Sequence, residues 1–161
     1  MAEQTRADVI RTLADMIRDV PVAMLTTTSA RGWLRSRPMV VQAPAFDGDL
    51  WFFTSGTAAK AADIRDRRQV NVSFASPERD RYVSMSGMAT LVADRERATR
   101  LWNRSYEPWF PKGLDDPDLI LIRVQAEDAQ YWDPAAKAMV YLPGLLETKP
   151  GFGDLEPGTG I

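Results

Sequence analysis

The sequence predicts a mainly β fold with flanking helices, in which six or seven antiparallel strands form a Greek-key-like barrel. Short runs rich in Val, Thr and aromatic residues alternate in polarity, as half-buried strands do. Turns containing Gly, Pro or Asp separate these runs, and helical periodicity is confined to short stretches. A chain of 161 residues is long enough to bury one core and too short to suggest two domains.

The first expected element is an amphipathic helix from Thr5 to Asp19. Apolar residues recur there at helical spacing, and Thr5 is a candidate N-cap. Pro21 ends this helix. Strands are then expected over residues 22–28 and 33–42, joined as a hairpin.

A turn over residues 46–49 leads into a third strand over residues 50–54. An Asp-Gly pair between two strand-like runs is a strong hairpin signal, so the second and third strands are expected to pair. The next elements are a helix over 58–67 with Ala61, Ala62 and Ile64 on its apolar side, strands over 69–75 and 81–91, a helix over 94–102 capped by Asp94, a strand over 119–126 and a short strand over 130–132.

Two parts of the chain are expected. Residues 1–142 form the domain, and residues 143–161, which are rich in Pro and Gly, form a mobile tail or one that drapes over a partner. No charged leader or uninterrupted apolar span is visible, which predicts a cytoplasmic protein that does not enter a membrane.

Composition excludes several kinds of chemistry. The chain has no cysteine and no histidine, which removes disulfides, thiolate metal sites, cysteine nucleophiles and the commonest general base. Asp115, Asp116 and Asp118 beside a proline are typical of a solvated turn, so we assign no metal. A net charge of −2 gives no basic surplus for nucleic-acid binding.

The segment from Leu50 to Lys60 combines three aromatics, a Ser-Gly-Thr run and a lysine near a helix start. Backbone N–H groups, hydroxyls and the helix dipole converge at such a point, which predicts an anion site. Aromatic residues beside it would support a flat ring carrying a phosphate. The alternative is that the aromatics are ordinary core and Lys60 covers an exposed helix.

The segment from Arg35 to Val41 places Pro38 in a predicted strand. Proline removes a ladder hydrogen bond, which indicates an edge strand or a bulge. A ligand or a second chain, rather than a neighbouring strand, would then meet this backbone.

From Val9 to about Trp132 the chain resembles the flavin-binding split barrels of the pyridoxamine 5'-phosphate oxidase type, and among them the bacterial general stress proteins. The resemblance rests on Met24-Leu-Thr-Thr27, Arg37-Pro-Met39, the segment from Asp47 to Thr54 with Lys60, Val70-Asn-Val-Ser-Phe74, Ser84 to Ala89, and Trp109 to Gly113 followed by Asp116-Pro117.

The resemblance implies a split-barrel homodimer with two FMN sites at the subunit interface. Arg37 to Val40 would lie along the isoalloxazine, Trp51 to Thr54 would cover the ring and ribityl chain, and Ser55 and Lys60 would lie near the phosphate. The implied cofactor-binding residues are Thr27, Arg37, Pro38, Met39, Val40, Trp51, Phe52, Phe53, Thr54, Ser55, Lys60, Trp109 and Phe110.

Some of these roles have alternatives. Arg37 would meet the phosphate, the pyrimidine edge of the flavin, or only a surface carboxylate. Trp109 and Phe110 resemble a segment donated by the second subunit, and core or dimer packing explains them equally well. Thr27 belongs to a threonine run that is also ordinary in strands.

The resemblance implies an FMN-dependent oxidoreductase linked to stress response. The namesake enzyme uses an arginine and histidine pair in its C-terminal region, and this chain has no histidine, so a true pyridoxamine 5'-phosphate oxidase is not expected. No catalytic residue is assigned, and no Gly-rich dinucleotide fingerprint is present. The alternatives are a flavin carrier or sensor without turnover, or a barrel that binds deazaflavin or haem.

Overall fold

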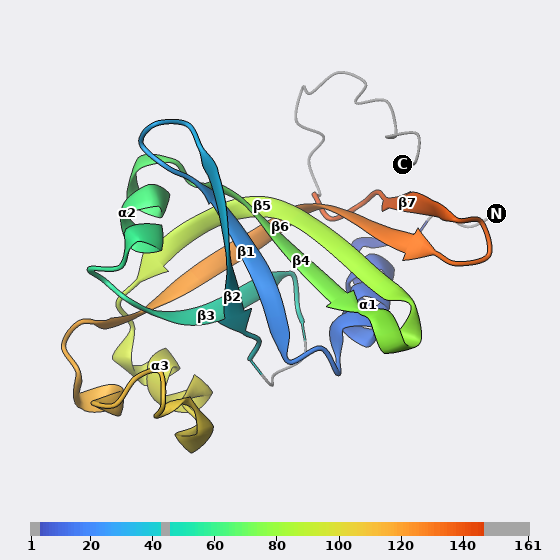
Figure 1. Cartoon of the computed structure of the whole chain (residues 1–161). Coiled ribbons are helices and arrows are strands. Elements are labelled where there is room, and N and C mark those ends of the chain that lie inside the picture. The colour runs from blue at the N-terminus through green and yellow to red at the C-terminus, as the bar shows by residue number, and fades with distance from the viewer. Residues whose placement is uncertain (1–3, 43–45, 147–161) are drawn as a thin grey trace.

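One curved antiparallel sheet organises the protein (Figure 1). The computed structural model describes residues 4–42 and 46–146. In this part of the chain the sheet has seven strands in the order β2-β1-β4-β5-β6-β3, and β7 pairs with β6. The predicted mainly β antiparallel fold is thereby confirmed as a half-barrel with three α-helices.

The bounds of most elements agree with the sequence prediction to within about two residues. The helices are α1 (Arg6–Ile17), α2 (Ala59–Asp66) and α3 (Arg95–Leu101), with short 3₁₀ turns at Pro77–Arg79, Arg104–Tyr106 and Gly113–Asp115. The strands are β1 (Val22–Thr28), β2 (Leu34–Val40), β3 (Asp49–Ser55), β4 (Gln69–Ser76), β5 (Arg81–Val92), β6 (Leu119–Asp133) and β7 (Ala138–Leu142).

Both predicted helix caps are confirmed. The Thr5 hydroxyl accepts from the Asp8 backbone N–H, and the Asp8 carboxylate accepts in return from the Thr5 N–H, so α1 begins with a capping box. Asp94 caps α3 through the Arg97 N–H. Figure 1 shows α1 and α2 at opposite ends of the curved sheet.

The predicted hairpin between β2 and β3 is wrong. β3 pairs with β6 along its whole length, whereas β2 pairs with β1. The turn itself forms: Gly48 has a φ of +113°, and the Asp47 carboxylate accepts from the Asp49 N–H. The turn residues therefore indicated only a local change of direction. The residues that pair with β3 lie between Leu119 and Gln125, much further along the chain.

Edge placement of β2 is confirmed, and it explains Pro38. Pro38 lies opposite Met24 of β1, and in the described part of the chain no strand pairs with the other side of β2. A proline at an edge removes a donor that would otherwise point to solvent or to a ligand.

β6 is one continuous strand where the sequence suggested two. The register against β5 shifts between Ser86 and Gly87. A Cβ on Gly87 would lie 2.1 Å from the backbone oxygen of Gln125, so only glycine fits this bulge. β7, which continues the sheet beside the second half of β6, was not predicted from the sequence.

The buried apolar side chains form two clusters. The main core joins α1, α2 and the strands, and Phe52 and Leu25 are among its fully buried members. A smaller cluster around Phe53 and Leu121 lies between β3 and the segment from Ala98 to Leu114. Leu145 of the predicted tail is buried in the main core, whereas Pro143, Gly144 and Leu146 are exposed, and residues 147–161 lie outside the described residues.

Candidate functional site

Predicted site residues converge on a cavity of about 90 Å³ beside the edge strand β2. Seven of them line it: Pro38, Met39, Val40, Phe53, Lys60, Trp109 and Phe110. Gln42 and Tyr106 complete the lining and were not predicted. The cavity therefore brings together four segments that are separate in the sequence, namely β2, β3, α2 and the 106–110 region.

One wall of this cavity is aromatic. The Phe53 ring centroid lies 5.5 Å from that of Trp102, 5.8 Å from Tyr106 and 6.2 Å from Phe110. These are tilted and edge-on contacts of the kind aromatic rings prefer. The Tyr106 hydroxyl donates to Oε1 of Gln42 at 3.0 Å, which fixes the ring beside β2. Burial raises the pKa of Tyr106, so its hydroxyl stays protonated at neutral pH.

A polar cluster of Thr27, Arg37 and Asp63, from β1, β2 and α2, lies next to the cavity. Nη1 of Arg37 donates to the Thr27 hydroxyl at 2.7 Å, and that hydroxyl donates to the Asp63 carboxylate at 2.8 Å. Nη2 of Arg37 lies 3.7 Å from the same carboxylate oxygen. The buried acid is thereby compensated both by a hydrogen bond and by an opposite charge.

Lys60 belongs to the cavity lining and is close enough to Arg37 to be affected by its charge. Burial lowers the pKa of Lys60, and the Arg37 charge lowers it further. Nζ of Lys60 lies 3.4 Å from the Met39 sulfur, a weak acceptor. Among residues 4–42 and 46–146, no carboxylate lies within ion-pair distance of Lys60. The site therefore holds a half-buried cation without an acidic partner in the described chain.

The hydroxyls predicted to bind an anion are already occupied. The Ser55 hydroxyl donates to Oδ2 of Asp118, and the Thr57 hydroxyl donates to the same oxygen at 2.9 Å. These hydrogen bonds lower the pKa of Asp118. Ser55 is thus held by an internal carboxylate at the end of β3, and it does not line the cavity.

The other residues of the predicted aromatic strand point in two directions, because successive side chains of β3 alternate. Phe52 and Thr54 are buried on the main-core side. Trp51 lies on the Phe53 side, where the Arg97 guanidinium carbon stands 4.4 Å from the centre of its ring. The structure brings none of these three residues to the cavity.

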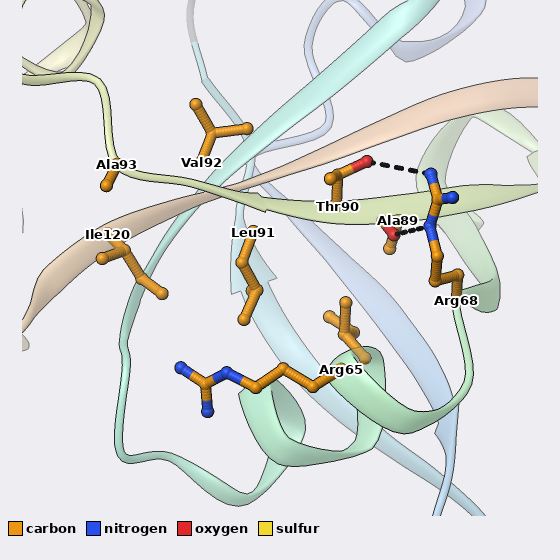
Figure 2. Close-up of a pocket in the computed structure, with 9 residues that line it drawn as sticks. Arg65, Arg68, Ala89, Thr90, Leu91, Val92, Ala93 and Ile120 are labelled. Atoms are coloured by element: carbon orange, nitrogen blue, oxygen red, sulfur yellow. Dashed lines mark hydrogen bonds between the residues drawn. The ribbon is translucent and has the colours of Figure 1, made fainter.

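A larger groove of about 370 Å³ lies between α2 and the ends of β5 and β6 (Figure 2). Arg68 donates there from Nε to the Ala89 carbonyl and from Nη2 to the Thr90 hydroxyl, both at 3.3 Å. Figure 2 shows Arg65 reaching across the groove opening from α2. No predicted site residue lines this groove, whereas seven line the cavity at Lys60, which is the better candidate site of the two.

Asp63 is the most informative residue that sequence reasoning missed. The predicted apolar side of α2 included Ala62, which is exposed, whereas Asp63 is buried. An acid between Ala61 and Ile64 on a short helix is an available signal, because a charge on a packed face needs a partner. Nothing in the sequence pattern identifies Thr27 and Arg37 as that partner.

A model of the family described as "Pyridoxamine 5'-phosphate oxidase like" matches residues 8–149. The chain belongs to this family. Protein bli-3 of Neurospora crassa is 30% identical over 132 residues, which cover 76% of this chain and 63% of that protein. General stress protein 26 of Bacillus subtilis is 28% identical over 92 residues, which cover 55% of this chain and 65% of that protein. Each match therefore spans slightly less than two thirds of the relative's length.

Solved structures of the family agree with the fold. A general stress FMN/FAD binding protein from Xanthomonas citri has a TM-score of 0.67 and 28% identity, covering 90% of this chain and 99% of that one. A protein related to general stress protein 26 from Clostridium acetobutylicum has a TM-score of 0.72 at 16% identity, covering 86% and 96%. The second likeness concerns the fold alone.

Neither a membrane-spanning helix nor a metal-binding cluster is found among the described residues. No described helix is long and apolar enough to cross a membrane. Within residues 4–42 and 46–146, His, Cys, Asp and Glu side chains form no group of three or more suited to a metal ion.

Proposed function

We propose that this family member binds FMN at the Lys60 cavity. The observation that carries the proposal is the convergence of a cationic side and an aromatic wall on one cavity beside an edge strand. An FMN phosphate carries close to two negative charges at neutral pH, and Lys60 is a cation with no acidic partner in the described chain. The Xanthomonas neighbour that binds FMN or FAD supports the assignment.

The residues present fit a flavin. Val40 and Pro38 on the exposed edge of β2, with Phe53 and Phe110 opposite, offer apolar surface for the ring. We place the phosphate beside Lys60 and Arg37, rather than at Ser55, because Asp118 already binds the Ser55 hydroxyl and would repel a second anion. A bound flavin supplies redox chemistry, and the protein contributes position and electrostatics.

We infer further that a second copy of the chain completes the site. Ligand pockets usually enclose roughly 300–1,000 Å³, so a cavity of about 90 Å³ is too small for a whole flavin. Val22, Met24 and Leu34 are exposed apolar residues on the β1–β2 hairpin, and Trp109 at the cavity is 64% exposed. Such surfaces favour association, which supports a homodimer with shared sites.

The proposed activity is that of an FMN-dependent oxidoreductase linked to stress response. Relatives named general stress proteins support the second part of this proposal. Synthesis of pyridoxal phosphate is not proposed, since the chain has no histidine. A flavin-binding carrier or sensor without turnover is the second candidate, because no described residue at the cavity is an evident acid or base apart from Lys60 and Tyr106. A cytoplasmic location is part of the same proposal.

One experiment tests the binding proposal. The visible absorption spectrum of the purified protein is recorded, and the small molecule released on denaturation is identified by mass spectrometry. FMN at about one copy per chain is the expected result. No chromophore, together with no binding when FMN is titrated into the protein, would refute it. Sedimentation of the same sample tests the dimer.

A further inference from the structure

Asp63 is a buried acid whose partners come from two other elements. Its side chain is 9% exposed, and the side chain of Arg37 is 19% exposed. A carboxylate in such a place is stable only when it is paired and hydrogen-bonded. Thr27 of β1 supplies the hydrogen bond and Arg37 of β2 supplies the charge. The arrangement links α2 to the β1–β2 hairpin, whose edge strand contributes Pro38, Met39 and Val40 to the cavity.

The direction of every hydrogen bond in this cluster is fixed by chemistry. Arginine has no acceptor, so its Nη1 must donate to the Thr27 hydroxyl. The single hydroxyl proton of Thr27 is then free to go to Asp63, which accepts it at 2.8 Å. Nη1 also lies 3.3 Å from the Leu25 carbonyl. One end of the guanidinium group is therefore anchored by two acceptors and the other end is held toward Asp63.

The anchoring leaves donors of Arg37 unused. Its Nε makes no hydrogen bond within the described part of the chain, and its contact with Asp63 through Nη2 is a long one at 3.7 Å. The Arg37 charge lowers the pKa of Lys60, so the two cations lie near each other. Within residues 4–42 and 46–146, Asp63 is the one carboxylate within ion-pair distance of either cation.

We propose that Asp63 is a positioning residue that acts through Thr27 to orient the Arg37 guanidinium toward the phosphate of the bound nucleotide. This inference rests on the proposed flavin site and specifies how the part of that site that binds the phosphate is built. A guanidinium held in one plane presents its remaining N–H donors in a fixed fork, which suits phosphate oxygens. Asp63 itself does not touch the ligand in this arrangement.

The test compares FMN with riboflavin, which has the same ring and lacks the phosphate. Dissociation constants of both are measured by quenching of flavin fluorescence for the wild type, Asp63→Asn, Thr27→Val and Thr27→Ser. We expect Asp63→Asn and Thr27→Val to weaken FMN binding about tenfold and to change riboflavin binding by less than about twofold. Thr27→Ser keeps the hydroxyl and should bind both ligands as the wild type does.

A second arm separates positioning from a general structural role. In an Arg37→Gln background, Asp63→Asn should cause no further loss of FMN affinity, because its effect passes through Arg37. If Asp63 only holds α2 in place, the loss would persist in that background and riboflavin would weaken as well, and the inference would be wrong. If Asp63→Asn does not fold, Thr27→Val still tests the inference. Valine has nearly the same shape as threonine and introduces no charge, but it lacks the hydroxyl that links Arg37 to Asp63.

The possible outcomes separate a failure of the positioning role of Asp63 from a failure of the proposed flavin site. If the wild type binds neither flavin, the proposed function fails and the positioning role fails with it. If the wild type binds FMN and the ratio of FMN to riboflavin affinity is unchanged in Asp63→Asn and Thr27→Val, the flavin site stands and only the role of Asp63 is refuted. Tighter FMN binding by Asp63→Asn would also refute it.

Discussion

The two sides of the cavity are stabilised by different kinds of interaction. The aromatic wall around Phe53 is a cluster of large rings in tilted contacts, with distances of 5.5 to 6.5 Å between centroids. The polar side around Arg37 depends on short directional hydrogen bonds and on compensation of charge. The first contributes mainly buried apolar area, and the second contributes mainly orientation. Stability and ligand specificity should therefore respond to different substitutions.

The largest loss of stability is expected on the aromatic wall. Phe53 is 4% exposed, and Phe53→Ala removes a ring that contacts three others. We expect the free energy of unfolding in urea to fall by about 3–5 kcal/mol. Leu34→Ala is the control, since Leu34 is 75% exposed and the substitution should change the free energy of unfolding of the single chain by less than about 0.5 kcal/mol. Equal effects of the two variants would contradict the assignment of the wall as core.

A loss of nearly the same size is expected when the polar cluster is broken on one side. Arg37→Gln leaves the buried Asp63 carboxylate without its charge partner, and we expect stability to fall by about 3 kcal/mol. Adding Asp63→Asn removes the uncompensated charge and should restore more than half of the loss. Urea unfolding of the single and double variants measures this. Additive losses in the double variant would show that the two residues do not compensate each other.

Lys60 makes flavin affinity depend on pH. Its pKa in the folded protein is lowered by burial and then by Arg37, so its charge is lost at a lower pH than the ordinary 10.5 of lysine. FMN affinity should fall as pH rises through that lowered pKa. Riboflavin has no phosphate, so deprotonation of Lys60 should not reduce its affinity. In the same window the unfolded chain holds more protons than the folded one, so the empty protein should gain stability as pH rises.

Lys60→Arg is the control for this pH dependence, because arginine keeps its charge throughout the range. Parallel titrations of FMN and riboflavin at several pH values measure it. A ratio of FMN to riboflavin affinity that changes with pH equally in the wild type and in Lys60→Arg would assign the dependence to another group.

The smallest effect on stability is expected at the outer end of the aromatic wall. Trp109 is 64% exposed, so Trp109→Ala should change the free energy of unfolding of the single chain by less than about 0.5 kcal/mol. If the proposed homodimer covers Trp109, the same substitution should weaken self-association in sedimentation velocity. If the dissociation constant of the dimer is unchanged, Trp109 does not contribute to the interface.

Much of the fold follows from local sequence signals. The Thr5 and Asp94 caps were predictable because a side chain a few residues away satisfies the first N–H groups of a helix. Pro38 marked an edge strand because proline cannot donate to a second neighbour. Resemblance to the family then added the cavity-lining residues of β2, β3 and α2, of which Met39, Phe53 and Lys60 lie together.

The pairing of β3 and the state of several polar groups required the tertiary structure. An Asp-Gly turn changes the chain direction within four residues. The strand that pairs with β3 is β6, however, and this pairing is between residues far apart in the sequence. Likewise the Ser55 hydroxyl seemed free for an anion until the fold brought Asp118 beside it.

The sequence by itself determined the type and order of the elements from α1 to β6 and the edge position of β2. These depend on interactions between near neighbours, which the order of residues records directly. Only the tertiary structure decided that Asp63, Thr27 and Arg37 form one cluster, and that Phe52 and Thr54 turn to the core while Phe53 turns to the cavity. Such contacts join positions far apart in the chain, and their geometry follows from how the whole sheet curves and packs.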